Sequence, residues 1–299
     1  MSSSSFPSIE NSVIERFNVS LNIKGHNLFI LRDDLIHPFI AGNKWRKLQY
    51  VIEEVRKGKF KGIITYGGAY SNHLVATATA CKLYNIPCVL VVRGEELNPK
   101  SNPYLMHCER EGAKLNFVSR QDFKKQKLQE GTRNVDGQAW LSIPEGGACA
   151  LGLKGCMQIL EDSTRFDIVA LAQGTTTTSL GVLLNCAPTT ALWGFPVLKG
   201  FDALAEMEQL ANRTGFLTEW EEKKKNFYAF NDFHFYGYAK HKNDVQQQII
   251  SMGIQGNFKL DPVYTGKALI GLITKLNEIK TKKNVLFIHT GGVLPIETT

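Results

Sequence analysis

Three basic residues crowd the first turn of one predicted helix. Lys44, Arg46 and Lys47 open the segment 43–55, and Asn43 stands where a capping side chain is expected. Apolar residues recur at helical spacing and predict its buried face: Leu48, Val51, Ile52 and Val55. The N-terminus of a helix is the positive end of its dipole, where cations are disfavoured. The pattern therefore indicates either an anion bound nearby or a lysine kept partly neutral for chemistry.

A second candidate is the loop "YGGAYSNH", residues 66–73, which joins a predicted strand to a predicted helix. Two glycines release the backbone from strand geometry, and Ser71 and Asn72 stand at the start of the helix. One interpretation is a glycine turn followed by a serine cap. The other is that N–H groups and these two small polar side chains face a carboxylate or a ring oxygen.

The segment "AQGTTTTSLG", residues 172–181, repeats the order of strand, glycine and helix. Its four consecutive threonines, Thr175 to Thr178, propagate a helix poorly but supply hydroxyl donors. The helix N-terminus adds N–H groups and a favourable dipole, so the pattern predicts phosphate binding. The G-K-[ST] ending of a P-loop is missing, and the absence of G-x-G-x-x-G argues against a Rossmann dehydrogenase.

Two further loops combine turn residues with hydroxyl groups: "LDPVYTGKAL" (260–269) and "FIHTGG" (287–292). Asp261 starts a turn ahead of a predicted helix, with Tyr264 and Thr265 at the beginning of that helix. Thr290 follows the last predicted strand. By themselves, these residues indicate helix caps and a turn.

Strands that alternate with helices must position these loops. The strand "GIITYGG" (62–68), the helical run 73–84 and the strand "CVLVV" (88–92) form one βαβ unit, which implies a parallel pair of strands. Further strands are predicted at 113–118, 167–172, 190–195, 226–230 and 284–292. The pattern predicts an α/β protein with parallel sheets, whose ligands bind at the carboxyl ends of the strands.

The rhythm of strands and helices breaks at the polar stretch 123–138, so we expect two sheets in two domains. The predicted smaller α/β domain comprises residues 48–150. The larger one comprises residues 1–47 and 151–299.

Composition limits the function classes. Of the 299 residues, 43% are hydrophobic, which is enough for a large core. The net charge of +7 rests on short basic runs without interleaved aromatic residues, so nucleic-acid binding is not expected. No stretch approaches the ~20 apolar residues of a membrane span. No secretion signal or C-x-x-C pair is present, so we expect a cytoplasmic protein with six reduced cysteines and no metal site.

Five segments, in order and over nearly the whole chain, carry a family resemblance: "GNKWRKL", "GAYSNH", "GTTTTSLG", "DPVYTGKA" and "FIHTGG". They resemble the pyridoxal-phosphate enzymes that include 1-aminocyclopropane-1-carboxylate deaminase and D-cysteine desulfhydrase. The resemblance implies pyridoxal 5′-phosphate as cofactor. It also implies two parallel-sheet domains with flanking helices, as in the tryptophan synthase β-like (fold type II) enzymes, with the larger domain binding the cofactor.

By this resemblance, Lys44 is the lysine that forms the Schiff base with the cofactor. Adjacent cations and the helix N-terminus would favour its neutral, nucleophilic amine, which accounts for the crowded first turn. The cofactor phosphate would lie on the loop that begins at Gly174. That loop contributes Gly174, Thr175, Thr176, Thr177, Thr178 and Ser179, and Thr176 replaces a glycine that is usual in the family.

The resemblance also assigns the remaining polar residues. Asn72 would bond the 3′-oxygen of the ring, and Ser71 would meet the substrate carboxylate or take part in proton transfer. Thr265 and Thr290 would stand beside the pyridine nitrogen, where the ring-opening deaminases carry glutamate and leucine. A neutral hydroxyl there makes a milder electron sink than a carboxylate would.

These threonines favour β-elimination: D-cysteine to pyruvate, ammonia and hydrogen sulfide. Lys44 would then remove the α-proton, and Tyr264 would assist the leaving sulfur. The alternatives are 1-aminocyclopropane-1-carboxylate deamination and a non-catalytic cofactor-binding homologue. The last is motivated by "VLPIETT" after Gly292, where the family usually has Pro-Ala-Leu-Phe. Relatives imply a homodimer; the amino-acid substrate and the proton donor to the leaving group stay open.

Overall fold

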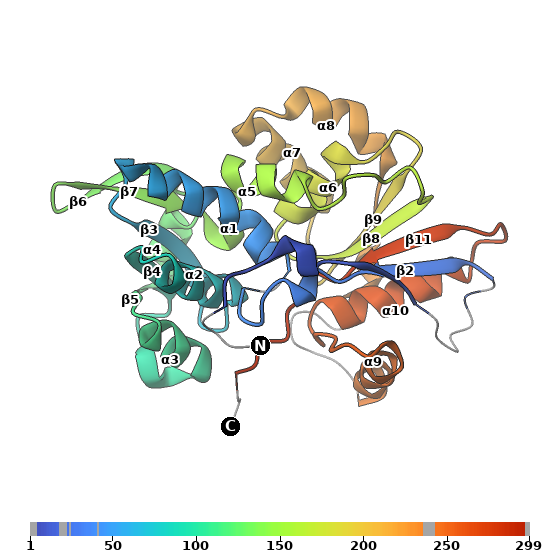
Figure 1. Cartoon of the computed structure of the whole chain (residues 1–299), viewed down its shortest axis with the longest axis horizontal. Helices are drawn as coiled ribbons and strands as arrows, with labels where there is room; N and C mark the ends of the chain where they lie inside the picture. Colours follow the sequence, from blue (N-terminus) through green and yellow to red (C-terminus); the bar gives the residue numbers. More distant parts are fainter. Residues whose placement is uncertain (1–4, 18–22, 24, 41, 236–242, 297–299) are drawn as a thin grey trace. The chain divides into compact units, whose positions relative to one another are not determined.

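The computed structural model describes residues 5–17, 23, 25–40, 42–235 and 243–296 (Figure 1). The chain forms two compact units. The first unit comprises the described parts of residues 1–7, 37–155 and 294–299, and the second unit those of residues 8–36 and 156–293. The predicted smaller domain began at residue 48 and ended at residue 150. In the structure, residues 37–47 cluster with this first unit rather than with the second. Which functional domain each segment belongs to stays a prediction.

The first unit is built on one sheet with the strand order β5-β4-β3-β7-β6. Its strands are β3 (Ile63–Gly68), β4 (Cys88–Arg93), β5 (Lys114–Val118), β6 (Gly131–Val135) and β7 (Gln138–Ile143). All neighbouring pairs are parallel except β6 with β7. The helices that begin in this unit are α1 (Asn43–Glu54), α2 (Asn72–Leu83), α3 (Pro103–Arg110), α4 (Arg120–Gln126) and α5 (Ala150–Met157). The predicted βαβ unit, β3–α2–β4, is confirmed.

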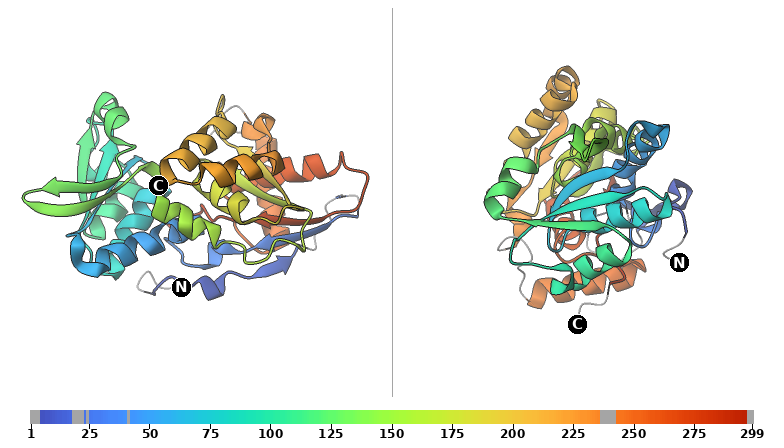
Figure 2. Two further views of the ribbon diagram at one scale, coloured as in Figure 1. Left: turned by 90° about the horizontal axis from the view of Figure 1, so that it is seen from above. Right: turned by 90° about the vertical axis from the view of Figure 1, so that its left-hand side faces the viewer.

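The polar stretch 123–138 is not the interruption that the sequence predicted. It contains the end of α4 and the strand β6, which pairs antiparallel with β7 through a tight turn. Asp136 and Gly137 form that turn with φ of 51° and 76°, the left-handed pair typical of a two-residue hairpin. In Figure 2, left, this green hairpin extends beyond the other strands of its sheet. Exposed residues of β6 alternate with half-buried ones, and most of the strand is polar, so no apolar run marked it.

The second unit contains a sheet with the order β1-β2-β11-β8-β9-β10. Its strands are β1 (Ile14–Arg16), β2 (Asn27–Leu31), β8 (Ile168–Gln173), β9 (Ala191–Pro196), β10 (Phe227–Ala229) and β11 (Asn284–Ile288). Only β1 pairs antiparallel, with β2. Sequence analysis predicted the last four of these strands and missed the β1–β2 pair. Both sheets are thus mostly parallel, and the α/β prediction is confirmed.

Helices cover both faces of this second sheet (Figure 1). α6 (Thr177–Asn185), α7 (Ala203–Thr214) and α8 (Leu217–Lys223) lie on one face, and α9 (Asn243–Gly256) and α10 (Thr265–Leu276) lie on the other. Alternate residues of β8 divide accordingly, because Ile168 and Ala170 pack in the core that includes Leu269 and Leu272 of α10. Both faces of β8 are therefore buried, as expected for a central parallel strand.

The described residues can be searched for membrane-spanning helices, metal-ligand clusters and disulfide bonds. Among these residues, no helix combines the length and the apolar character needed to cross a membrane. The same residues contain no group of three or more His, Cys, Asp or Glu side chains that could hold a metal ion. All six cysteines are buried, and the described structure has them as free thiols.

Candidate active site

The predicted helix at Lys44 exists, but its cap is not the predicted residue. Gly42 is the N-cap of α1, with φ of 58° and no side-chain capping bond. A positive φ favours glycine, so Gly42 adopts the cap conformation and Asn43 falls one residue inside the helix. Asn43 is instead the first helical residue, and its Oδ1 accepts a 2.8 Å hydrogen bond from Lys44 Nζ. The prediction that Asn43 caps this helix was therefore wrong.

The other two cations of this turn point into the protein. Arg46 is 5% exposed and Lys47 is 1% exposed, which is rare for charged side chains. Lys47 Nζ donates a 3.0 Å hydrogen bond to the carbonyl oxygen of Gly146. The next residue, Gly147, has φ of 71°, and a Cβ there would lie 3.3 Å from Lys47 Cβ. The loop after β7 therefore packs directly on the buried lysine.

Sequence analysis passed over that loop, "PEGGA", although a proline and two glycines after an apolar strand are a clear turn signal. Gly155, in α5, makes a second close approach to the same turn. A Cβ at Gly155 would lie 1.8 Å from the carbonyl oxygen of Arg46, so only glycine fits. Two glycines thus let α5 and its preceding loop reach the first turn of α1.

Ser71 and Asn72 stand at the start of α2, as predicted. Ser71 is the N-cap, and its Oγ accepts a 3.3 Å hydrogen bond from the backbone N–H of Leu74. Gly67 makes room for this serine, because a Cβ at Gly67 would lie 2.8 Å from Ser71 Oγ. The capping interpretation is confirmed for Ser71. Both Ser71 and Asn72 stay half-buried, so their side chains are partly accessible.

His73 is held in one tautomer. The sequence analysis assigned no role to this residue. Thr65 Oγ1 donates its only hydrogen to the carbonyl oxygen of Ile143 at 3.0 Å. The 2.9 Å contact between Thr65 Oγ1 and His73 Nε2 therefore has the histidine as donor. The proton is on Nε2, and His73 Nδ1 is a buried acceptor without a hydrogen-bond partner in the described structure.

The surroundings of His73 are electropositive. Burial, followed by the charges of Lys47 and Lys44, lowers the pKa of His73 to about 3. The imidazole is consequently neutral at physiological pH. Burial disfavours a charge of either sign, whereas the two lysines by themselves favour an anionic ligand such as a carboxylate.

In the second unit, the threonine segment forms the predicted strand-to-helix loop. β8 ends at Gln173, and Thr176 is the N-cap of α6. Thr176 has φ of −79° and ψ of −6°, a helical conformation that any L-residue adopts. A glycine is thus not required at this position, which explains why threonine can stand where the family usually has glycine.

Two hydroxyl groups at the start of α6 point to a ligand. Thr177 and Ser179 are fully buried, and neither Thr177 Oγ1 nor Ser179 Oγ has a hydrogen-bond partner in the described structure. Leaving a hydroxyl buried and unpaired costs about 1–3 kcal/mol, so such groups usually have a partner. Together with the N–H groups of the helix N-terminus, they match the acceptor oxygens of a phosphate.

Tyr264 lies against this phosphate-type loop. A Cβ at Gly174 would come within 2.9 Å of Tyr264 Cε1, so the absence of a side chain at Gly174 admits the ring. Asp261 Oδ1 fixes the backbone beside the ring by accepting from the N–H of Val263 at 2.8 Å and that of Tyr264 at 2.7 Å. The predicted turn at Asp261 is confirmed.

Thr265, the first residue of α10, and Thr290, in the loop after β11, lie on two segments in mutual contact. Thr265 is fully buried, and its Oγ1 accepts a 2.9 Å hydrogen bond from the backbone N–H of Asp261. Thr290 is 8% exposed and follows β11. Gly292, with φ of 123°, lies so close to Asp261 that a Cβ there would be 2.8 Å from Asp261 Cβ. The structure therefore brings together the two predicted pyridine-side loops.

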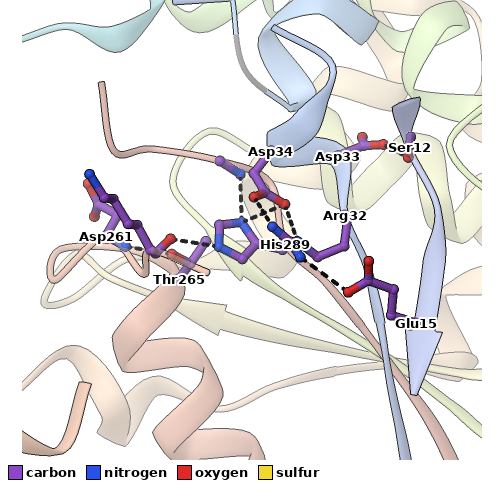
Figure 3. Close-up of polar contacts among 10 residues, drawn as sticks. Ser12, Glu15, Arg32, Asp33, Asp34, Asp261, Thr265 and His289 are labelled. Atoms are coloured by element: carbon purple, nitrogen blue, oxygen red, sulfur yellow. Dashed lines mark hydrogen bonds and ion pairs between the residues drawn. The ribbon is translucent and has the colours of Figure 1, made fainter. Parts of the chain in front are cut away.

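A polar cluster that sequence analysis did not anticipate surrounds His289, the residue before Thr290 (Figure 3). Arg32 and Asp34 follow β2, and His289 follows the neighbouring strand β11. The carboxyl ends of parallel neighbours meet at one edge, which is why these residues converge. The predicted site residues thus fall into two groups, with Lys44, Ser71 and Asn72 in the first unit and the others in the second.

Comparison with known proteins gives a consistent family. A model of the family "pyridoxal-phosphate dependent enzyme" matches residues 11–291. A Pyrococcus abyssi protein, named provisionally as a 1-aminocyclopropane-1-carboxylate deaminase, is 32% identical over 90% of this chain and 85% of its own. The mitochondrial bifunctional D-cysteine desulfhydrase/1-aminocyclopropane-1-carboxylate deaminase of Arabidopsis thaliana is 28% identical over 94% of this chain and 76% of its own. The crystal structure of a homologue of 1-aminocyclopropane-1-carboxylate deaminase superimposes with a TM-score of 0.71 at 26% identity, covering 97% of this chain and 93% of the other.

Proposed function

Because this chain belongs to the family of pyridoxal-phosphate-dependent enzymes, we propose that it catalyses β-elimination on a small amino acid, with D-cysteine as substrate. D-Cysteine and water would give pyruvate, ammonia and hydrogen sulfide. The pair Thr265 and Thr290 carries this choice, since threonine stands at both predicted pyridine-side positions, where the ring-opening deaminases carry glutamate and leucine. When bound, pyridoxal phosphate supplies an electron sink that acidifies the α-hydrogen and labilises a β-substituent.

The loop that begins at Gly174 would hold the phosphate. Thr177 Oγ1 and Ser179 Oγ would gain the acceptors that they lack, and Thr175, Thr176 and Thr178 add further hydroxyl groups beside them. Each hydrogen bond to a charged oxygen is worth about 1.5–3 kcal/mol net. Several such bonds and the helix dipole would anchor the dianion without a lysine in the loop.

Lys44 would bind the cofactor covalently through Nζ and would move the α-proton. Asn43 Oδ1 already orients Nζ at 2.8 Å. Asn72 would donate to the 3′-oxygen of the ring. Ser71, whose Oγ accepts from a backbone N–H, keeps its hydroxyl hydrogen available for the substrate carboxylate.

Tyr264 would assist the leaving sulfur. Its ring packs against Gly174, and its backbone N–H is held by Asp261, so the phenol lies on a rigid loop next to the proposed phosphate site. A phenol hydroxyl donates a proton readily to a thiolate that is departing. Thr265 Oγ1 accepts from the N–H of Asp261, so its hydroxyl hydrogen stays available for the pyridine side of the cofactor.

The deamination of 1-aminocyclopropane-1-carboxylate is the second candidate, because relatives that are 32% and 28% identical to this chain are named for that activity. Opening a cyclopropane ring needs a stronger electron sink than losing a thiol does, which the two threonines disfavour. A homodimer and a cytoplasmic location also stay predictions. Light scattering at several protein concentrations would test the dimer.

The decisive experiment is a visible spectrum of the protein after incubation with pyridoxal phosphate, followed by product assays. Wild type should acquire the absorption of the bound cofactor, and Lys44→Ala should not, whereas Lys82→Ala, an exposed lysine on α2, should behave as wild type. D-Cysteine should then yield pyruvate and sulfide. Ketobutyrate from the cyclopropane acid would favour the deaminase instead. Cofactor uptake without turnover of any amino acid would favour the non-catalytic homologue.

A further inference from the structure

The carboxyl ends of β2 and β11 place a buried histidine between two loops of the proposed site. β2 and β11 are parallel neighbours, and the backbone N–H of His289 donates to the carbonyl oxygen of Leu31 at 2.9 Å. His289 is 1% exposed, and its ring packs edge-on against Phe258 at 5.4 Å between centroids. The position of this side chain is thus determined by both the sheet and the core.

The hydrogen bonds of His289 define its tautomer. Gly291 N–H donates to His289 Nδ1 at 3.2 Å, so Nδ1 is an acceptor and carries no proton. Nε2 therefore carries it and donates to the carbonyl oxygen of Lys259 at 2.8 Å. The neutral imidazole satisfies both nitrogens, and the imidazolium would set an N–H against the N–H of Gly291.

These two bonds join the segments that carry the pyridine-side threonines. Lys259 leads into the turn that ends at Thr265, and Gly291 directly follows Thr290. One rigid ring therefore sets the spacing between the two loops (Figure 3). The close packing of Gly292 on Asp261 is a second contact between the same loops.

Burial keeps the imidazole neutral although a carboxylate lies beside the ring, and an arginine compensates that carboxylate. Asp34 Oδ1 lies 3.7 Å from His289 Nδ1, where an uncompensated carboxylate would favour the imidazolium. Arg32 binds both oxygens of Asp34, at 2.9 Å each, and reaches Glu15 at 3.2 Å. Burial lowers the pKa of His289, Asp34 opposes this shift, and Arg32 adds to it.

We propose that His289 is a positioning residue: its neutral imidazole, compensated by the Arg32–Asp34 pair, holds the Thr290 hydroxyl at the pyridine-nitrogen side of the bound cofactor. This inference rests on the proposed function for the identity of the ligand. It adds that Arg32 and Asp34, which follow β2, influence the ring nitrogen of the cofactor through a histidine that need not touch the ligand. Protonation of His289 would break the Gly291 bond and move Thr290.

The first test needs no cofactor. Nitrogen-15 NMR of histidine-labelled protein should show His289 with a protonated Nε2 and a bare Nδ1. Arg32→Gln should raise the pH at which His289 becomes protonated, because it removes a cation. Glu15→Gln, which removes a half-exposed carboxylate on the far side of Arg32, should lower that pH only slightly. If Arg32→Gln does not fold, Asp34→Asn should lower that pH instead. A proton on Nδ1, or protonation at one pH in all variants, would overturn the proposal.

The second test uses the cofactor-loaded protein. His289→Gln can still donate to Lys259 but loses the Nδ1 acceptor, and His289→Asn keeps an acceptor for Gly291 but cannot reach Lys259. Each should weaken cofactor binding about fivefold, the equivalent of one hydrogen bond. With ring-labelled [15N]pyridoxal phosphate, both should shift the ring nitrogen signal in the direction given by Thr290→Val.

An unchanged ring signal in the histidine variants, when Thr290→Val shifts it, would mean that His289 only supports folding, and would overturn the proposal. If Thr290→Val itself leaves the signal unchanged, Thr290 does not stand at the ring nitrogen, and the inference fails for that reason. If wild-type protein takes up no pyridoxal phosphate, the proposed function fails, and the positioning role falls with it whatever the tautomer.

Discussion

Gly174 and Tyr264 are in contact in the second unit, because a Cβ at Gly174 would lie 2.9 Å from Tyr264 Cε1. This contact couples the proposed phosphate loop, which follows β8, to the start of α10, ninety residues later in the chain. The missing side chain at Gly174 thus positions a residue proposed to act at the substrate.

Gly174→Ala should push the Tyr264 ring away from the loop, because the alanine methyl would overlap it. Overpacking of this kind typically costs about 1–3 kcal/mol. We expect cofactor affinity and kcat with D-cysteine to fall together, by about five- to a hundredfold. Tyr264→Phe, which keeps the ring and removes the hydroxyl, should bind the cofactor as wild type does and lose only kcat. Equal cofactor affinity in Gly174→Ala and wild type would contradict the coupling.

Thr177→Val should have opposite effects on the free and the cofactor-bound protein. Without cofactor, the change removes a buried, unpartnered hydroxyl and should raise the free energy of unfolding by about 1 kcal/mol. With cofactor, it removes a phosphate donor and should weaken binding about tenfold or more. Urea unfolding and fluorescence titration measure the two effects. Ser179→Ala should also weaken binding.

Thr274→Val in α10 is the matched control, because its Oγ1 already bonds the carbonyl oxygen of Ile270 at 2.9 Å. It should destabilise the protein slightly and leave cofactor affinity unchanged. A loss of stability in cofactor-free Thr177→Val would show that its hydroxyl already has a partner, and would remove the main structural support for the phosphate site.

Folding stability should fall with acid below the ordinary histidine pKa. Burial and nearby cations lower the pKa of His73 to about 3, and burial and Arg110 lower that of His107 to about 4. Between these values and about 6.5, the unfolded chain binds protons that the folded chain does not, so stability rises with pH across this window. Each fully buried neutral histidine contributes a slope of up to about 1.4 kcal/mol per pH unit.

His73→Gln should reduce this slope, since glutamine does not titrate. The measurement is urea unfolding of wild type and variant at several pH values between 4 and 7. Above pH 7 the two proteins should show a constant difference in stability. Parallel curves over the whole range would mean that His73 takes up its proton in the folded state, contrary to its burial beside Lys47.

The thiols should be inert in the native protein. All six cysteines are buried, and burial raises the pKa of Cys149 to about 12 and that of Cys186 to about 11. The reactive species is the thiolate, so a disulfide reagent such as Ellman's should react slowly with the folded protein and with all six thiols in denaturant. Rapid reaction of one native thiol would reveal local opening around it.

Local sequence determined the parts of the site that each lie within one strand, one loop and one helix. Glycine after an apolar run, followed by small polar residues, was enough to predict the loops at Ser71 and at Thr177. The turn at Asp261 follows from a side chain that bonds N–H groups two and three residues ahead. These features could be predicted because their determinants are close together in the chain.

Errors arose where a backbone angle or a pairing partner decided the outcome. Asn43 has a capping side chain, but the positive φ of Gly42 shifted the cap by one residue. The β6–β7 hairpin carried its Asp136-Gly137 turn signal, yet its polar strand lacked an apolar pattern. A strand of this kind is stabilised by pairing with a neighbour rather than by its own composition.

Only the tertiary structure decided the contacts that tune the site. Lys47 bonds the carbonyl of Gly146, and His289 bonds the carbonyl of Lys259. In each case the partner is a backbone oxygen far away in the sequence, and every residue has such an oxygen. Residue types therefore give no sign of these contacts, which arise when the strand order brings distant loops together at the carboxyl ends of the sheets.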